Sequence, residues 1–241
     1  MKFTKGLYAY CIIDREFSPD PNYPLPDQTF SINYQNIAAV VSMLSESGWQ
    51  PTKQNIMNHQ KVITKIQEGF TVLPLRFGMV FKDREEIDAL IEEKYSEIQL
   101  LLLKIRGRVE LGLRLFWHHE AFVDDIGKRT IEDLKKEYLR ASQDRYSAAI
   151  EVGKFVEEVV NRRREEYIKR IYEPLQAAAD DALLNPITGE KMVFNAAFLV
   201  AENLTGHFDR TVEDFQTQYK DKLIFRYSGP WPPYNFVAVN W

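Results

Sequence analysis

One stretch of the chain, from Asp83 to Trp117, constrains the fold more than any other. Asp83 stands at an expected helix N-cap, and Glu86 follows three residues later in the capping-box position. Apolar residues then recur at spacings of three and four as far as Ile105, which predicts a helix with one buried face. Gly107 ends the helix, and apolar residues alternate through RVELGLRLFW (108–117), which predicts a half-buried strand. The chain therefore combines helices and strands.

The remaining elements follow from similar patterns. Strands are expected over 6–13, around 36–42, and over 70–81, 192–201 and 222–228. Helices are expected over 52–69 and 207–220, and within a mostly helical middle from about 129 to 183 whose central part is 145–172. Pro74 and Gly78 restrict 70–81 to an edge strand or a strand broken by a bulge. Pro174 should kink or stop the central helix.

These elements predict an α+β chain of two domains, each a mixed or antiparallel sheet covered by helices on one face. A length of 241 residues suits one large or two smaller domains. We place the boundary near Gly107, so that 1–106 form an N-terminal α+β domain and 107–241 form the C-terminal domain. The order of elements in the second half predicts a ferredoxin-like domain with inserted helices at about 125–145.

Composition argues against several classes of partner. A net charge of −4 offers no basic excess for binding nucleic acid. No window approaches the roughly 18 apolar residues that a membrane span needs. The single cysteine, Cys11, lies among apolar residues of the first expected strand and is predicted to be a core residue. We therefore expect neither nucleic acid nor a lipid membrane as partner, and no disulfide framework.

The strongest sign of an enzyme is the run His118, His119 and Glu120. Adjacent residues of a strand point to opposite faces, so the two histidines could share a metal ion only if the strand has already ended. No nucleophile or phosphate-binding motif accompanies them. We expect no catalytic residues, no metal and no cofactor. A ferredoxin-like ligand- or metal-binding enzyme that uses these three residues remains the alternative.

The C-terminal stretch YSGPWPPYNFV (227–237) breaks the rules of regular structure. Proline fixes φ and removes a backbone donor, so the stretch cannot be the middle of a helix or a central strand. It either packs back on the molecule as a structural strap or presents its aromatic rings to another protein. The stretch TVLPLRFGMVF (71–81) leaves the same two interpretations open.

LPLRFG (73–78) is followed by a helix and the strand GRVELGLRLFW, and GPWPPYNFV lies near the C-terminus. In this combination of motifs the chain resembles the gas vesicle protein F/L family. The N-terminal LYAYCII and the strand NAAFLV (195–200) before a short helix fit the same pattern. We favour the F branch over the L branch, because the chain lacks a long charged linker or tail.

The resemblance implies a minor structural or accessory protein of gas vesicles, the gas-filled protein shells that give cells buoyancy. It implies no enzymatic activity. Its expected partners are the hydrophobic shell protein and other gas vesicle accessory proteins. Its expected location is the cytoplasm before assembly and then the gas vesicle, on the gas-facing side of the shell.

Two sets of site residues follow. The set expected to bind the partner comes from the C-terminal stretch: Trp231, Pro232, Pro233, Tyr234 and Phe236. The set expected to be architectural comes from the family motifs: Leu73, Pro74, Leu75, Arg76, Phe77, Gly78, Gly107, Glu110, Gly229 and Pro230. Arg76 is expected to pair with a carboxylate of the neighbouring helix.

Overall fold

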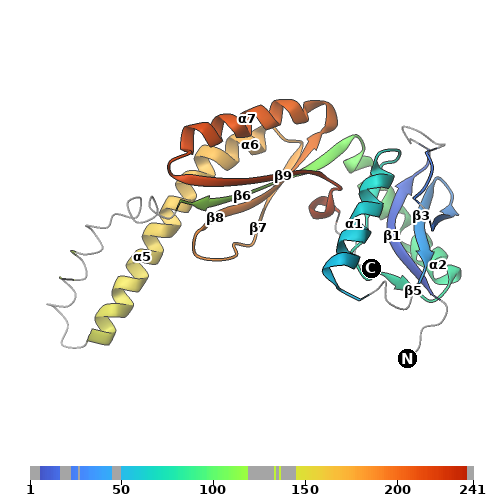
Figure 1. The fold of residues 1–241 in the computed structure, drawn as a ribbon, viewed down its shortest axis with the longest axis horizontal. Coiled ribbons are helices and arrows are strands. Elements are labelled where there is room, and N and C mark those ends of the chain that lie inside the picture. The colour runs from blue at the N-terminus through green and yellow to red at the C-terminus, as the bar shows by residue number, and fades with distance from the viewer. Residues whose placement is uncertain are drawn as a thin grey trace. The chain divides into compact units, whose positions relative to one another are not determined.

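The chain folds into two compact units, each of which contains one sheet and its covering helices (Figure 1). The computed structural model describes residues 6–16, 23–26, 28–44, 50–118, 133, 136 and 145–237. Unit 1 comprises Met1–Glu110 together with Pro230–Trp241, and unit 2 comprises Leu111–Gly229. The expected domains differ from these units in one respect that matters for the site. The C-terminal stretch from Pro230 onward belongs to unit 1, although it follows unit 2 in the sequence.

Unit 1 is built on an antiparallel sheet of five strands. The strands are β1 (Leu7–Asp14), β2 (Thr29–Tyr34), β3 (Ile37–Met43), β4 (Val72–Pro74) and β5 (Val80–Phe81). Their order is β2-β3-β1-β4, and β5 also pairs with β1. The expected strand at 36–42 is thus the second arm of a hairpin whose first arm, β2, the sequence analysis missed. The expected strand at 70–81 is interrupted, because Gly78 has a φ of 91° that a regular strand cannot contain.

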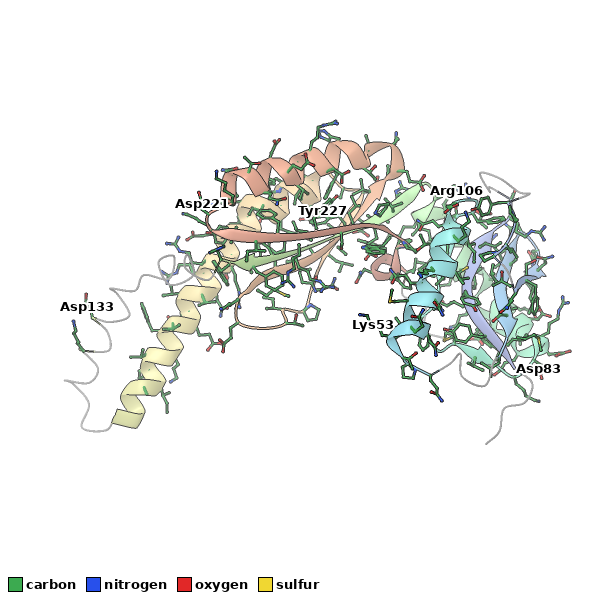
Figure 2. The ribbon with its side chains drawn as sticks, in the orientation of Figure 1. Lys53, Asp83, Arg106, Asp133, Asp221 and Tyr227 are labelled. Carbon is green, nitrogen blue, oxygen red and sulfur yellow. The ribbon has the colours of Figure 1, made fainter. Side chains whose placement is uncertain are left out.

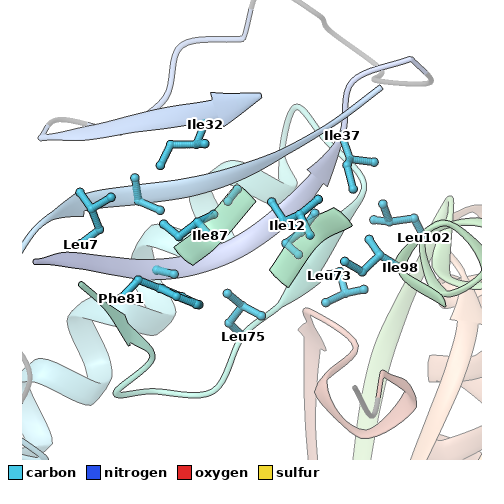
Figure 3. Packing of buried hydrophobic residues seen from close by; sticks show 14 of the residues in the cluster. Leu7, Ile12, Ile32, Ile37, Leu73, Leu75, Phe81, Ile87, Ile98 and Leu102 are labelled. Atoms are coloured by element: carbon cyan, nitrogen blue, oxygen red, sulfur yellow. The ribbon is translucent and has the colours of Figure 1, made fainter. Parts of the chain in front are cut away.

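Helices cover both faces of this sheet, and not one face as expected. Helix α2 (Arg84–Ile105) packs its apolar stripe on one face, where Ile87 and Ile98 meet Leu7 and Ile12 of β1 in one buried cluster (Figure 3). Helix α1 (Lys53–Gln67) covers the other face through Ile63 and Ile66. The sheet therefore lies between two apolar clusters, and β1, β3 and β4 bury residues on both sides.

A bulge in β1 decides which residues face α1. The register between β1 and β3 shifts between Ala9 and Cys11. Ala9 packs in the cluster under α2, whereas Tyr10 and Cys11 both pack in the cluster under α1. The extra residue breaks the alternation of the strand and turns two consecutive side chains toward the same helix. Cys11 is fully buried, as predicted for a core residue, and burial raises the pKa of its thiol.

The predicted start of α2 is confirmed in its main contact. The Asp83 carboxylate accepts a hydrogen bond from the Glu86 backbone N–H at 3.1 Å. The Glu86 carboxylate in turn accepts from the backbone N–H of Lys82, one residue before the N-cap, at 2.6 Å. Both carboxylates thus hold backbone donors at the N-terminus of the helix, where negative charge is also favourable.

Unit 2 is built on a four-stranded sheet in the order β7-β8-β6-β9. The strands are β6 (Arg108–Trp117), β7 (Asp181–Asn185), β8 (Met192–Ala201) and β9 (Leu223–Trp231). The helices are α5 (Arg145–Tyr167), η1 (Ile168–Tyr172), α6 (Glu173–Ala177) and α7 (Thr205–Tyr219), with a short turn, η2 (Glu202–Leu204), before α7. Rings on strands meet rings on helices, as in the contacts Trp117–Tyr167 and Phe198–Phe208.

The order of elements along unit 2 is β-α-β-β-α-β, which the ferredoxin-like prediction requires. Beyond this order, that part of the fold class stays a prediction. The helices expected at about 125–145 lie outside the described residues, apart from Asp133 and Lys136, which are helical. The α+β class is confirmed in both units.

Two boundaries in unit 2 differ from the prediction. The helical middle ends at Ala177, and the residues expected to continue it form β7, which pairs antiparallel with β8. Pro174 does not stop the helix at once, since α6 continues to Ala177, but the preceding turn is a π-helix, η1, in which the Glu173 N–H donates to the Ile168 carbonyl. The wider turn shifts the bonding pattern just before the proline, which lacks a donor of its own.

Candidate partner-binding surface

The C-terminal stretch leaves unit 2 along β9 and ends on unit 1. β9 is an edge strand of its sheet, so Pro230 near its end removes no bond to a further strand. A short 3₁₀ turn, η3 (Tyr234–Phe236), follows, in which the Phe236 N–H donates to the Pro233 carbonyl at 3.1 Å. The prediction that this stretch belongs to no helix interior or central strand agrees with this path.

A buried carboxylate holds η3 in place. Glu110 is only 6% exposed, and its two oxygens accept from the backbone N–H of Asn235 at 2.8 Å and from its side-chain amide at 2.5 Å. Burial raises the pKa of Glu110, and the two bonds from Asn235 act in the opposite direction. Glu110 is thus a hydrogen-bond acceptor for η3, and the architectural role expected for it from the sequence stays a prediction.

The rings of the stretch pack into unit 1. Phe236 is 5% exposed, and the Lys104 ammonium lies 5.6 Å from its ring centroid. Tyr234 packs against the cluster under α1, and Val237 packs against the cluster under α2. Burial raises the pKa of the Tyr234 hydroxyl. The stretch therefore contacts both apolar clusters of unit 1 within four residues.

These contacts change the expected set of partner-binding residues. Pro232, Pro233 and Phe236 are buried, so in this structure they cannot meet another protein, and Tyr234 is half-buried. The reason is that the Glu110 carboxylate binds Asn235 and that the stretch packs against the two apolar clusters. Trp231 is the exception, with 36% of its surface exposed. The stretch is a strap for most of its length and presents one aromatic ring.

The LPLRFG motif lies in the same unit and is mostly architectural in its contacts. Leu73 and Leu75 are buried in the cluster under α2, and Pro74 ends the edge strand β4. Gly78 adopts a positive φ, which favours glycine at this turn. Arg76 is exposed, and no ion pair joins it to a carboxylate among the residues that the structure describes. The expected pairing of Arg76 with the neighbouring helix is therefore not seen.

A buried polar network fixes this motif to α1 and β1. The His59 ring, 4% exposed, lies 3.0 Å through Nε2 from the Leu75 carbonyl and 2.9 Å through Nδ1 from the Tyr8 hydroxyl. The Gly78 N–H donates to the same hydroxyl at 3.3 Å. A carbonyl can only accept, so Nε2 carries the proton, and Nδ1 accepts from Tyr8. Each group then has one consistent role in the chain of bonds.

Sequence reasoning missed the residues of this network. His59 lies in the helix expected over 52–69 and Tyr8 in the strand expected over 6–13, and no motif singles out either residue. The stacked ring of Tyr10 and the edge-on ring of Phe77 complete the surroundings of His59. Burial lowers the pKa of His59, which agrees with the neutral ring that the bonds require. The signal available in the sequence was His59 itself, a lone polar residue on the apolar face of α1.

The remaining motif residues have local roles. Gly107 has a φ of 63° and follows the end of α2, as a helix-terminating glycine does. Gly229 has a φ of 130°, directly before Pro230. Both glycines stand close to the points where the chain passes between units, after Glu110 and after Gly229.

The alternative enzyme site is not supported. His118 lies at the exposed end of β6, where its backbone N–H donates to the Lys222 carbonyl at 2.8 Å. His119 and Glu120 lie outside the described residues. Among the residues that are described, no group of three or more His, Cys, Asp or Glu side chains could hold a metal ion. No observation on the described part of the chain connects His118 to a reaction.

The fold defines the class of protein, which is an α+β chain of two units. Its candidate site is the exposed ring of Trp231, on a C-terminal segment that Glu110 holds through Asn235. Comparison with known proteins identifies the family. The model of the family "Gas vesicle synthesis protein GvpL/GvpF" matches residues 6–238, so the chain belongs to this family. The family expected from the sequence motifs is thereby confirmed.

Individual relatives agree with this assignment. Gas vesicle protein F of Nostoc sp. is 26% identical over 98% of this chain and 100% of its own. Gas vesicle protein F of Dolichospermum flosaquae is 28% identical over 78% of this chain and 79% of its own. Gas vesicle protein L1 of Halobacterium salinarum is 22% identical over 97% of this chain and 91% of its own. The chain is thus more similar to these two F proteins than to L1, as expected.

Solved structures share the fold. The crystal structure of the gas vesicle protein GvpF from Anabaena sp. superposes with a TM-score of 0.81 at 25% identity, covering 98% of this chain and 100% of that chain. GvpF from Microcystis aeruginosa gives a TM-score of 0.80 at 24% identity, covering 97% of this chain and 99% of that chain. None of the helices in the described part of the chain is long and apolar enough to cross a membrane.

Proposed function

We propose that the chain is a minor structural or accessory protein that binds the shell protein, or another gas vesicle protein, during vesicle formation. Its family membership supports a role in gas vesicles and associates it with other gas vesicle proteins. A gas vesicle shell subunit must present apolar surface to the gas. A protein that contacts such a subunit benefits from an exposed aromatic ring on a rigid support.

The exposure of the Trp231 ring is the observation that supports this proposal most strongly. Trp231 is 36% exposed, whereas the next two residues are buried prolines and Phe236 is 5% exposed. Asn235, bonded to Glu110, fixes the end of the same strap. A tryptophan held in this way loses little conformational freedom on binding, which favours its use as a contact residue. Tyr234, Phe236 and the two prolines support it and make no contact with the partner themselves.

The experiment compares two aromatic positions of unit 1. Trp231→Ala should reduce co-purification of the shell protein with the tagged full-length chain at least tenfold. Phe30→Ala, which removes a ring that is 40% exposed on the edge strand β2, is the matched control and should leave co-purification unchanged. Unchanged circular dichroism spectra and melting temperatures show that both variants fold. Equal co-purification by the Trp231 variant and the unmodified chain would refute the role of this ring.

The place of the chain on the gas-facing side of the shell, which the resemblance implies, belongs to the same proposal. Protease treatment of intact and of collapsed vesicles tests it. The chain should resist digestion in intact vesicles and be cleaved after collapse. Equal digestion in both samples would place it on the outer surface.

A further inference from the structure

Unit 1 contains a pocket that the role of Trp231 does not use. It lies where the end of α2, the end of β1 and the β2–β3 turn meet, and it is lined in part by Arg106, which follows α2 and is labelled in Figure 2. Its volume is about 260 Å³. Small-molecule sites usually occupy about 300–1,000 Å³, so the pocket suits one long side chain better than a cofactor.

The polar side of the pocket is held by a continuous set of hydrogen bonds. Asp14 is 3% exposed, and its carboxylate accepts from the Arg106 guanidinium at 3.0 Å and from the Glu16 backbone N–H at 3.1 Å. The Asn36 side-chain amide donates to the Glu16 carboxylate at 3.0 Å, and its oxygen accepts from the Gln99 amide at 3.3 Å. The lining is therefore fixed before any partner arrives.

The charges of this lining are unequal. Arg106 forms an ion pair with Asp14 at 3.0 Å. Glu16 is exposed, and the bond from Asn36 involves a neutral amide. No cationic side chain of the described residues forms an ion pair with Glu16. Among the side chains that line the pocket, two carboxylates and one guanidinium leave an excess of one negative charge, which favours a cationic occupant.

An apolar surface adjoins the pocket on α2. Leu103 lines the pocket and is 57% exposed, and Leu100, one turn earlier, is 68% exposed. Residues three apart lie side by side on a helix, so the two side chains form one surface. Leucines this exposed on a helix whose other face is buried mark a surface that a partner can cover. The pocket and this surface together describe an occupant with adjacent basic and aliphatic residues.

We propose that the pocket receives a lysine or arginine side chain of another gas vesicle protein, and that an aliphatic neighbour of that residue covers Leu100 and Leu103. The cation meets the Glu16 carboxylate and the side-chain oxygen of Gln99, whose nitrogen is already used toward Asn36. This inference rests on the proposed function, because it takes a gas vesicle protein as the partner. It adds a second contact surface, on α2, to the ring of Trp231.

Site-specific photo-cross-linking tests the proposal. The full chain carries p-benzoylphenylalanine at position 103 in cells that produce the complete set of gas vesicle proteins. The matched control carries it at Ile187, which is 44% exposed in unit 2. We expect an adduct from position 103 and none from position 187. Mass spectrometry should place it on an aliphatic residue within two positions of a lysine or arginine.

A charge reversal supplies the second measurement. Glu16→Lys should reduce the yield of this adduct at least tenfold, whereas Glu16→Gln should reduce it less. An adduct that Glu16→Lys leaves unchanged, or a cross-linked peptide without a basic residue, would overturn the proposal. So would the lack of any adduct while the chain still co-purifies with gas vesicle proteins, a result that leaves the proposed function intact. If the unmodified chain co-purified with no gas vesicle protein, that result would contradict the proposed function as well.

Discussion

At the residue scale, Glu110 determines whether the strap stays attached to unit 1. Glu110→Ala removes both acceptors of Asn235 and leaves a backbone N–H without a partner, which should destabilise unit 1 by about 1–3 kcal/mol. Glu110→Gln keeps one acceptor and should cost about 1 kcal/mol. Urea denaturation, monitored by hydrogen exchange of the backbone amides of unit 1, measures both changes in the free energy of unfolding. Equal stability of the Ala variant and the unmodified chain would show that the bonds to Asn235 are dispensable.

His59 makes the stability of unit 1 depend on pH. Burial lowers its pKa in the folded state below the unfolded value of 6.5, so only the unfolded chain gains a proton just below pH 6.5. The stability that the neutral ring provides is therefore complete above pH 6.5 and declines as the pH falls below it. Protonation would also remove the acceptor that Tyr8 uses.

The corresponding variant is His59→Gln, which keeps one donor and one acceptor. Between pH 7.5 and 5.5 the unmodified chain should lose about 1 kcal/mol more stability than the variant. Denaturant titrations at the two pH values give this difference. Glu110, whose pKa is also shifted, is present in both proteins and cancels in the comparison. Identical pH dependence of the two proteins would contradict the assigned role of His59.

At the scale of elements, two glycines with open surroundings should respond oppositely to alanine. A Cβ added at Gly78 or at Gly153 would meet no atom within 4 Å apart from the adjacent residues and, at Gly153, the backbone of its own helix. Gly78 has a φ of 91°, so Gly78→Ala strains the LPLRFG turn and should destabilise by about 1 kcal/mol or more. Gly153 lies within helix α5, so Gly153→Ala should stabilise by about 0.5–1 kcal/mol. Thermal unfolding checks both, and changes of equal sign would contradict this explanation.

The elements also show what the sequence could predict. Helix α2 and strand β6 were predicted closely, because their periodicity, the N-cap Asp83 and Gly107 all agree locally. Strand β7 was missed, because its pairing with β8 is a tertiary contact that outweighs the helical pattern. The motifs identified the family, yet the burial of Phe236 depends on Glu110, more than 100 residues earlier in the chain. Such long-range contacts leave no local pattern.

At the scale of the whole molecule, the chain closes unit 1 with residues that come after unit 2. A chain that stops after Gly229 loses Tyr234 and Phe236 from unit 1 and leaves the Glu110 carboxylate buried without Asn235. We expect faster hydrogen exchange throughout β1, β4 and α2, and unchanged exchange in β8 and α7. Uniform loss of protection in both units would show that the two units do not unfold independently of each other.

We propose that this chain acts by binding gas vesicle proteins and forms part of the vesicle or of its assembly intermediates. Quantitative immunoblotting of purified vesicles and of assembly intermediates, with an antibody to the chain, measures this most directly. We predict a constant amount of the chain per amount of shell protein through repeated flotation, and a reduced amount for Trp231→Ala. Absence of the unmodified chain from both the vesicles and the intermediates would contradict the account.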